Sequence, residues 1–341
     1  MGLGLFLLLF SSIGRFVMSR RQLRYQERHV DEEEDEIEVG SNKEMSAIPP
    51  VSKHTLPAND ELRLFQQSFK YLFDSPSLET FIQTVKGDLF NRDYIKAFGD
   101  DDRRMAYCVR WTPSRSLAYG SLFASLAEVR TVITSENSNI LVIGGGACGE
   151  LVALGSIYTQ HQSLKALNET PDSINIKLVD IADWTKIVGK IVSEVKKNWT
   201  YQSPDAFNVD FMNGDVLSLE PSLLGLSSVD LITTMFTTNE LFAEDRAKSL
   251  RFFQSLNKEC HSGCLLLITE SAGSYSHIEV GKKKFPIQFL IDTILLGKDQ
   301  KSGDWDLIKQ SESCWYRCDK SFDYPLKLEN MRFFFRLYRK K

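Results

Sequence analysis

Cysteine is scarce in this sequence, and its scarcity excludes one class of protein. Six cysteines in 341 residues do not form the dense disulfide framework of a small secreted domain, which indicates a reducing compartment. Zinc-binding cysteine pairs usually have two intervening residues. Here three residues intervene, and Cys264 opens an apolar run typical of a buried strand. We therefore expect no metal. A four-thiolate site is the alternative for the two equally spaced pairs, Cys260 with Cys264 and Cys314 with Cys318.

An excess of positive charge is also lacking. The formal net charge is −4, so the chain is not a uniformly basic polyanion-binding protein. Seven acids within residues 31–38 dominate that sum, and the rest of the chain carries +3. A polyanion would have to bind local basic patches, and the alternative for each patch is an ordinary solvated face. The patches are Lys282–Lys284 and the group Arg336, Arg339, Lys340 and Lys341.

The sequence has no uninterrupted apolar run long enough to cross a membrane. Residues 1–18 are apolar, but a spanning helix needs about 20 such residues, and Ser11, Ser12, Gly14 and Arg15 interrupt the stretch. A signal peptide would carry its positive charge before the apolar core rather than after it. We interpret Met18 as the true start and expect no stable membrane association. The alternatives are a start at Met1 and an organelle-directed presequence in residues 1–17.

Residues 1–60 are predicted to form a disordered, acidic tail. They are rich in acids, prolines and serines, and they have too few large apolar side chains to offset the entropy of ordering. A helical apolar stripe begins near Glu61. We predict a helical cap over residues 61–135.

The stretch Ile140–Leu151 best indicates a function. A four-residue apolar run, typical of a buried strand, ends in a glycine cluster and leads into a helical sequence. Gly144, Gly146 and Gly149 fit the pattern G-x-G-x-x-G, which permits a tight turn, close backbone approach to a ligand and close helix packing. With Gly145 they predict a cofactor loop at a helix N-terminus. The alternative is a glycine-rich turn that ends the strand for steric reasons.

An acidic residue follows the next predicted strand. Residues 175–179 form a buried strand that ends on Asp180. In a βαβ unit a carboxylate at this position accepts ribose hydroxyl groups, so we predict that Asp180 binds the cofactor. An ordinary acid at a strand-end turn is the alternative.

The segment before the glycine strand combines arginines with aromatic residues more densely than a core requires. Thr112 and Pro113 have the form of an N-cap and a first helical residue, so we predict a helix from 114 to about 132. Arginine and tryptophan at the mouth of this helix could hold a cofactor carboxylate or stack on a base. Ion pairs with the acids at 100–102 are the alternative. We assign Arg110 to the cofactor, and Arg92, Trp111 and Arg115 to the substrate.

Strands and helices alternate along the rest of the chain, which predicts an α/β fold with a parallel sheet. Two strands without an intervening helix close the sequence. This order resembles the class I S-adenosylmethionine-dependent methyltransferases, which have a Rossmann-like, seven-stranded sheet. The predicted strands are 140–143, 175–179, 207–212, 229–233, 264–269, then 305–309 or 314–318, and 333–338.

Five motifs make the resemblance more specific. Over about residues 69–339 the sequence resembles the fungal 25S rRNA uridine-N3 methyltransferases. The resemblance makes residues 136–341 the S-adenosylmethionine-binding methyltransferase domain, preceded by the helical extension. The motifs are Leu89–Tyr94, Arg110–Arg115, Gly144–Glu150, Asp180–Trp184 and Thr238–Phe242.

This resemblance implies an enzyme of ribosome biogenesis that methylates N3 of one uridine in large-subunit rRNA. Its implied partner is that rRNA or a pre-ribosomal particle. We expect a monomer in the nucleolus or nucleus, with the cytoplasm as the alternative. By position, the cofactor pocket would comprise Gly144, Gly146, Gly149, Asp180 and Asp215, and the residues facing the base would be Thr238, Asn239 and Glu240.

Methylation at N3 requires the uracil N3–H to lose its proton before the nitrogen attacks a methyl group. Glu240 is the predicted base, and Thr238 or Asn239 could hydrogen-bond the flanking carbonyl oxygens. The alternative for Glu240 is an acid in the first turn of a helix. An exocyclic amine is not the favoured target, because the Asn-Pro-Pro-Tyr type of motif is missing. Three other functions remain open: methylation of a protein or small molecule, a ribosome-assembly binding module on an inactive fold, and NAD-linked oxidoreduction.

Overall fold

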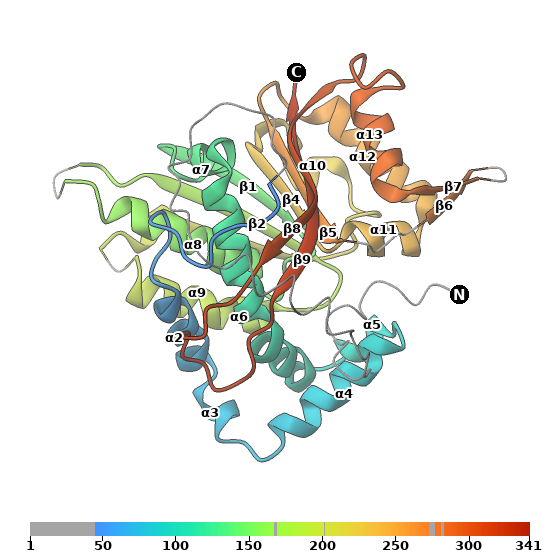
Figure 1. Ribbon diagram of the computed structural model, residues 1–341. Coiled ribbons are helices and arrows are strands. Elements are labelled where there is room, and N and C mark those ends of the chain that lie inside the picture. Colours follow the sequence, from blue (N-terminus) through green and yellow to red (C-terminus); the bar gives the residue numbers. More distant parts are fainter. Residues whose placement is uncertain (1–44, 167–168, 201, 273–276, 281–282) are drawn as a thin grey trace, which may run out of the picture.

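A computed structural model of the protein describes residues 45–341, apart from 167–168, 201, 273–276 and 281–282 (Figure 1). The predicted start site, presequence and acidic run lie outside the described residues. So does Lys282 of the predicted basic patch.

A seven-stranded sheet forms the centre of the molecule (Figure 1). Its order, β3-β2-β1-β4-β5-β9-β8, is that of the class I methyltransferase fold, so the predicted fold is confirmed. The first five strands are parallel, and β9 pairs antiparallel with both β5 and β8. The chain changes direction across the sheet between β1 and β4, which opens a ligand crevice at the carboxyl ends of these strands. The strands are β1 (Asn137–Ile143), β2 (Ser173–Asp180), β3 (Phe207–Asn213), β4 (Leu231–Met235), β5 (Leu265–Ser271), β8 (Trp305–Tyr316) and β9 (Met331–Lys340).

The last hairpin resolves an ambiguity in the sequence. The two alternatives for the sixth predicted strand, 305–309 and 314–318, belong largely to one strand, β8. Its pairing with β9 shifts register twice, between Leu307 and Lys309 and between Ser311 and Cys314. These irregularities break the alternating pattern, which is why the sequence suggested two short strands. A separate two-stranded ribbon is formed by β6 (His277–Val280) and β7 (Lys283–Pro286).

Helices cover both faces of the sheet (Figure 1). Alternate residues of β1 point to opposite faces: Ile140 and Val142 join the larger core cluster, and Leu141 and Ile143 join the smaller one. The larger cluster includes residues of α2 (Ala58–Ser68), α4 (Leu78–Phe90), α6 (Asp101–Ser125), α7 (Ala127–Ile133), α8 (Gly149–Gln162) and α9 (Thr185–Asn198). The smaller includes residues of α10 (Pro221–Leu224), α11 (Thr238–Glu244), α12 (Arg246–Glu259) and α13 (Ile287–Leu296). Two short helices, α3 (Lys70–Phe73) and α5 (Tyr94–Ala97), complete the described set.

The prediction that a helix begins at Thr112 and Pro113 is wrong. Helix α6 begins at Asp101, where Asp100 accepts the Arg103 N–H (2.9 Å), and it continues through Pro113. Proline lacks an N–H and therefore leaves the carbonyl four residues earlier without its helical partner. Here that carbonyl belongs to Val109, and the hydroxyl group of Tyr324 donates to it (2.7 Å). A tertiary hydrogen bond from the β8–β9 connection thus stabilises a proline inside a long helix.

The prediction of disorder is wrong for residues 45–60. Ile48 is buried, and its N–H donates to the carbonyl of Trp315 on β8 (2.9 Å). The Leu56 N–H donates to Ser156 of α8 (2.9 Å), and α2 begins at Ala58. These contacts order residues 45–60 although their composition is loop-like. The helical cap shares one core cluster with the sheet, so it is part of the same packed unit.

Candidate cofactor and substrate site

The carboxyl ends of β1, β2 and β4 meet at the glycine loop. Gly144 has a φ of 75°, a left-handed conformation that glycine adopts without steric cost. Its N–H donates to the carbonyl of Val179 on β2 (2.8 Å). Thr237, after β4, fills the space that a side chain at Gly144 would need. A Cβ at Gly149 would lie 2.9 Å from the Tyr119 ring, so this glycine lets α8 approach α6.

Gly146 and Asp180 form the ribose side of the predicted pocket. The Gly146 N–H donates to Asp180 Oδ2 (3.0 Å), and the Ala182 N–H donates to Oδ1 (3.0 Å). Burial raises the pKa of Asp180, and these two hydrogen bonds oppose that shift. Each carboxylate oxygen keeps a second lone pair, so Asp180 can still accept the hydroxyl groups of a ribose. A side chain at Gly146 would clash with the indole of Trp184.

Glu150, in the first turn of α8, provides a test of whether a cofactor fits. Its side chain is buried, and Oε1 has no hydrogen-bond partner among the residues that the structure describes. Burial raises the pKa of Glu150 to about 8, while its own backbone N–H and the charge of Arg115 lower it. A buried oxygen without a partner is costly unless a ligand donates to it. The ammonium group of S-adenosylmethionine is such a donor, so the residues around the loop fit that cofactor.

Asp215 follows β3, next to the end of β2, and its carboxylate accepts hydrogen bonds from the turn that it begins. Its Oδ1 accepts the Leu217 N–H (2.9 Å), and its Oδ2 accepts the Ser218 hydroxyl (2.6 Å). The preceding Gly214 N–H donates to the carbonyl of Asp180 (2.8 Å), which joins the ends of β2 and β3. Both carboxylate oxygens therefore have a structural partner in addition to any cofactor contact.

The two predicted arginines of α6 have different environments. Arg110 pairs with Glu329 (2.7 Å) and donates to the carbonyl of Lys327 (3.0 Å), so it holds the β8–β9 connection. Arg115 donates to the hydroxyl group of Tyr107. Its side chain also lies 3.8 Å from the point where a Cβ on Gly149 would be. Arg115, rather than Arg110, is therefore the arginine beside the glycine loop.

The alternative of ion pairs with the acids at 100–102 is wrong for both arginines. Asp100 pairs with Arg103 (3.1 Å), and Asp101 pairs with Arg104 (2.8 Å) and Lys186 (3.2 Å). Asp100 and Asp101 thus pair with basic residues other than Arg110 and Arg115.

Trp111 is buried beside a cavity of about 190 Å³. Its ring lies 5.3 Å from that of Tyr107, and the Arg110 guanidinium lies 5.3 Å from its centre. Arg115 and Phe236 also line this cavity. Arg92, the third predicted substrate residue, is exposed at the end of α4, and its charge lowers the pKa of Glu240.

The turn after β4 is held by buried hydrogen bonds. The hydroxyl groups of Thr238 and Thr234 lie 3.0 Å apart. Asn239 donates to Glu270 of β5 through its backbone N–H (2.8 Å) and its side-chain amide (2.7 Å). Thr238 and Asn239 are both buried, and neither lines the cavity beside Trp111.

Glu240 meets the helical cap. The hydroxyl group of Tyr94 on α5 donates to Glu240 Oε1 (2.7 Å). Burial raises the pKa of Glu240, whereas the Tyr94 hydroxyl and the Arg92 charge lower it. A carboxylate with a raised pKa is a stronger base, which suits proton abstraction.

Three residues of this region were not predicted as site residues. Glu270 is buried with a pKa raised to about 8 by burial, and it anchors Asn239. Its position at the end of a predicted strand was a usable signal. Tyr94 belongs to the motif Leu89–Tyr94, but nothing in the sequence indicates its hydrogen bond to Glu240, 146 residues away. The sequence gives no reason to single out Phe236, an apolar residue after a strand, yet its backbone has a left-handed φ of 60°.

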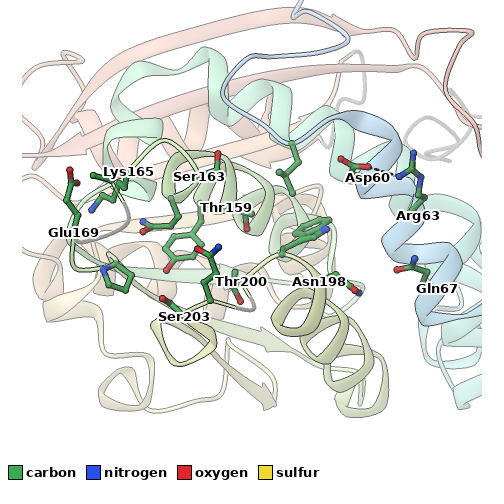
Figure 2. Close-up of a pocket in the computed structure, with 17 residues that line it drawn as sticks. Asp60, Arg63, Gln67, Thr159, Ser163, Lys165, Glu169, Asn198, Thr200 and Ser203 are labelled. Carbon is green, nitrogen blue, oxygen red and sulfur yellow. Dashed lines mark hydrogen bonds and ion pairs between the residues drawn. The ribbon is translucent and has the colours of Figure 1, made fainter.

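A larger cavity lies in a different place (Figure 2). It has a volume of about 720 Å³ and lies between α2 and the C-terminal ends of α8 and α9. These helix ends precede β2 and β3, so the cavity lies at the amino ends of the strands, opposite the glycine loop. Two cations that line it are already paired, Arg63 with Asp60 (3.1 Å) and Lys165 with Asp172 (2.5 Å). None of the predicted site residues lines it.

Three further expectations concern charge, metals and membranes. The C-terminal basic patch is largely paired internally: Arg336 contacts Asp292 (3.8 Å), and Lys340 contacts Asp304 (3.7 Å). Within the described residues, no group of three or more His, Cys, Asp or Glu residues is arranged to hold a metal ion. Among the same residues, no helix combines the length and the hydropathy required for a membrane span.

The chain is similar in sequence to known methyltransferases. Residues 65–339 match a family described as "Putative SAM-dependent methyltransferase". The chain is also 47% identical over 326 residues to the 25S rRNA (uridine(2843)-N(3))-methyltransferase of Saccharomyces cerevisiae. That match covers 87% of this chain and 89% of the yeast protein.

Solved structures show weaker likeness. The N-methyltransferase NodS from Bradyrhizobium japonicum is 12% identical, with a TM-score of 0.34, over 62% of this chain and 92% of that chain. An O-methyltransferase family protein from Burkholderia thailandensis is 11% identical, with a TM-score of 0.37, over 72% and 62%. These values add nothing to what the strand order shows. On the sequence matches, the chain belongs to the family of S-adenosylmethionine-dependent methyltransferases.

Proposed function

We propose that this protein methylates N3 of a uridine in large-subunit rRNA. The observation that carries the proposal is the 47% identity, over 87% of the chain, to a yeast protein whose name states that reaction. A match of this length includes cap helices as well as the sheet.

The cofactor assignment follows the packing around the glycine loop. In this proposal the loop Gly144–Gly149 and Asp180 hold the nucleoside end of S-adenosylmethionine, with Asp215 at the adenine. Arg115 replaces Arg110 as the group that binds the cofactor carboxylate, because Arg110 is paired with Glu329. Glu150 accepts from the ammonium group. The bound cofactor supplies an electrophilic methyl group.

Glu240 is the proposed base. The uracil N3 proton passes to a carboxylate oxygen of Glu240, and the nitrogen lone pair is then available to form the new bond. The Tyr94 hydroxyl orients this carboxylate from the cap. In this proposal Thr238 and Asn239 face the base, and their hydrogen bonds to Thr234 and Glu270 hold the turn in place.

The cellular setting is part of the same proposal. An enzyme with this target would act on large-subunit rRNA or a pre-ribosomal particle, in the nucleolus or nucleus, during ribosome biogenesis. We propose that it acts as a monomer.

Mapping of N3-methyluridine in rRNA tests the proposed function. A methyl group on N3 blocks base pairing, so reverse transcription of rRNA stops at the modified uridine. Cells without the protein should lose one such stop in large-subunit rRNA, and the wild-type gene should restore it. Asp180→Ala should not restore it. Asp210→Ala is the matched control, since Asp210 is an exposed acid on β3 that pairs only at the surface with Lys177 (3.7 Å).

The alternatives predict other results. An unchanged set of stops in the deletion strain, together with methyl transfer to a protein or small molecule by the purified chain, would replace the proposal. Cofactor binding without transfer to any of these substrates would favour a binding module.

A further inference from the structure

The cavity beside Trp111 has walls from three parts of the chain. Trp111 comes from α6, Phe236 from the turn after β4, and Trp315 from β8. Ser271, the last residue of β5, also lines it, so the cavity lies at the carboxyl ends of the strands. Arg115 lies between this cavity and the glycine loop. The cavity therefore adjoins the predicted cofactor pocket.

Phe236 has an unusual backbone conformation. Its φ of 60° lies in the left-handed region, which is an outlier for a bulky residue. The surroundings hold it there: its N–H donates to the carbonyl of Thr269 (2.8 Å), and its ring stacks 6.3 Å from that of Tyr119. Backbone strain of this kind is found preferentially at ligand sites. Here it sets the orientation of an aromatic wall.

Two arginines lie beside the Trp315 wall, and Glu329, an acid of the cavity lining, is paired with Arg110 (2.7 Å). The guanidinium groups of Arg317 and Arg332 lie 4.7 and 5.6 Å from the centre of the Trp315 ring. Both arginines are exposed, and Arg332 is oriented by a hydrogen bond to Ser313 (2.8 Å). Asn330, which also lines the cavity, is fixed by the Cys318 N–H (2.9 Å), and its side-chain NH₂ group can only donate.

We propose that this cavity binds an unpaired base that flanks the target uridine in the RNA strand, with Trp315 as one of the stacking walls. This inference rests on the proposed function and names the residues that recognise its substrate. The Asn330 NH₂ group can donate a hydrogen bond to a carbonyl oxygen of this base. Arg317 and Arg332 bind the flanking phosphates.

The geometry favours an unpaired nucleotide. A base within an A-form duplex is stacked and paired, and side chains cannot reach its edge through the deep, narrow major groove. Proteins that bind single-stranded RNA stack its unpaired bases on aromatic side chains. Three aromatic walls around about 190 Å³ suit one base and leave the duplex outside.

Binding of RNA probes to purified full-length variants tests this inference. The probe is a fluorescent single-stranded oligouridine, and the comparison is the same strand paired with oligoadenosine. Trp315→Leu and Trp315→Phe form a matched pair, since both keep an apolar side chain but only one keeps the ring. We expect Trp315→Leu to weaken oligouridine binding about 5- to 100-fold, the range for one stacked base, and Trp315→Phe to remain near wild type.

Charge is tested separately. Arg332→Ala should weaken oligouridine binding and lower the slope of log affinity against log salt by about one. Arg251→Ala, on an exposed arginine of α12, is the control and should change neither. Calorimetry with S-adenosylmethionine should give unchanged affinity for both Trp315 variants.

Wild-type affinity in Trp315→Leu would overturn the inference, as would equal binding of the paired probe. Loss of binding in Trp315→Leu alone supports it. If that result appears while rRNA from deletion cells keeps every N3-methyluridine, the pocket stands and the proposed rRNA target fails.

Discussion

The Glu240 carboxylate accepts a hydrogen bond from Tyr94, a residue of the cap, and this contact gives a test of its role at the residue scale. The Tyr94 hydroxyl lowers the pKa of Glu240, so Tyr94→Phe should raise that pKa further. A base acts only when deprotonated. We therefore expect the acidic limb of the kcat profile to move to higher pH, with cofactor affinity unchanged, as measured by methyl transfer across pH.

Glu240→Gln is the companion variant. Turnover should fall by about 10²-fold or more, and high pH should restore part of it because solvent then ionises the uracil. Wild-type turnover in this variant at every pH, with an unmoved profile in Tyr94→Phe, would mean that positioning rather than proton abstraction accelerates the reaction.

A second prediction at this scale concerns the ribose contact. Asp180 is held by two backbone N–H groups at the end of β2, so Asp180→Ala removes a charged acceptor without removing any core packing. Cofactor binding should weaken by about 1 to 3 kcal/mol, measured by calorimetry. Asp210→Ala should bind like wild type. Unchanged affinity in Asp180→Ala would mean that the ribose binds elsewhere. Binding of NAD in place of S-adenosylmethionine would contradict the assignment of the cofactor.

The sequence predicted the roles of some site residues better than those of others. The glycines and Asp180 were accessible because a strand, a tight turn and a following acid are consecutive in the chain. Arg110 and Arg115 could not be told apart, since their partners, Glu329 and Tyr107, depend on tertiary packing. Tyr94 was missed for the same reason, whereas Glu270 could have been predicted from its position at the end of a buried strand.

At the scale of elements, α6 provides the clearest test of packing. Tyr324 donates to the Val109 carbonyl that Pro113 leaves without a helical partner. Tyr324→Phe should destabilise the protein by about 1 to 3 kcal/mol, because a buried acceptor loses its donor. In the background of Pro113→Ala, which supplies an N–H, the same change should cost less. Denaturant unfolding of the four proteins measures the coupling, and equal costs in both backgrounds would rule out this account of the proline.

Strand periodicity predicted the sheet well, since β1, β4 and β5 are largely buried and β2 alternates buried Ile174, Ile176 and Leu178 with partly exposed residues. It failed where tertiary contacts override local signals. Pro113 looked like a helix start, and the shifts of register made β8 look like two strands. The ordered segment from 45 to 60 has a loop-like composition, and its order comes from contacts with β8 and α8.

At the scale of the whole molecule, three buried carboxyl groups link stability to pH. Burial raises the pKa of Glu61, Glu150 and Glu270 to about 8 each. The unfolded chain has the ordinary value of about 4.3. Between these values the folded protein holds more protons than the unfolded one, so these groups lower stability as pH rises.

We therefore expect Tm to fall less steeply between about pH 5 and about pH 8 in Glu61→Gln than in the wild type. Glutamine keeps the acceptor for the Ser156 hydroxyl (2.6 Å) but does not titrate. Glu79→Gln, on the exposed side of α4, is the control and should keep the wild-type slope. Parallel curves for all three proteins would show that Glu61 is not protonated in the folded state.

The bond from Tyr324 to Val109 also sets an order of events during synthesis. The two residues are 215 positions apart, and the chain leaves the ribosome N-terminus first. The Val109 carbonyl of α6 is therefore synthesised long before Tyr324, its donor. The Ile48 N–H is likewise synthesised long before the Trp315 carbonyl to which it donates. A nascent chain that stops before the last hairpin would have the glycine loop, Trp111 and Phe236 but not Trp315, so the third aromatic wall of the cavity is the last to form.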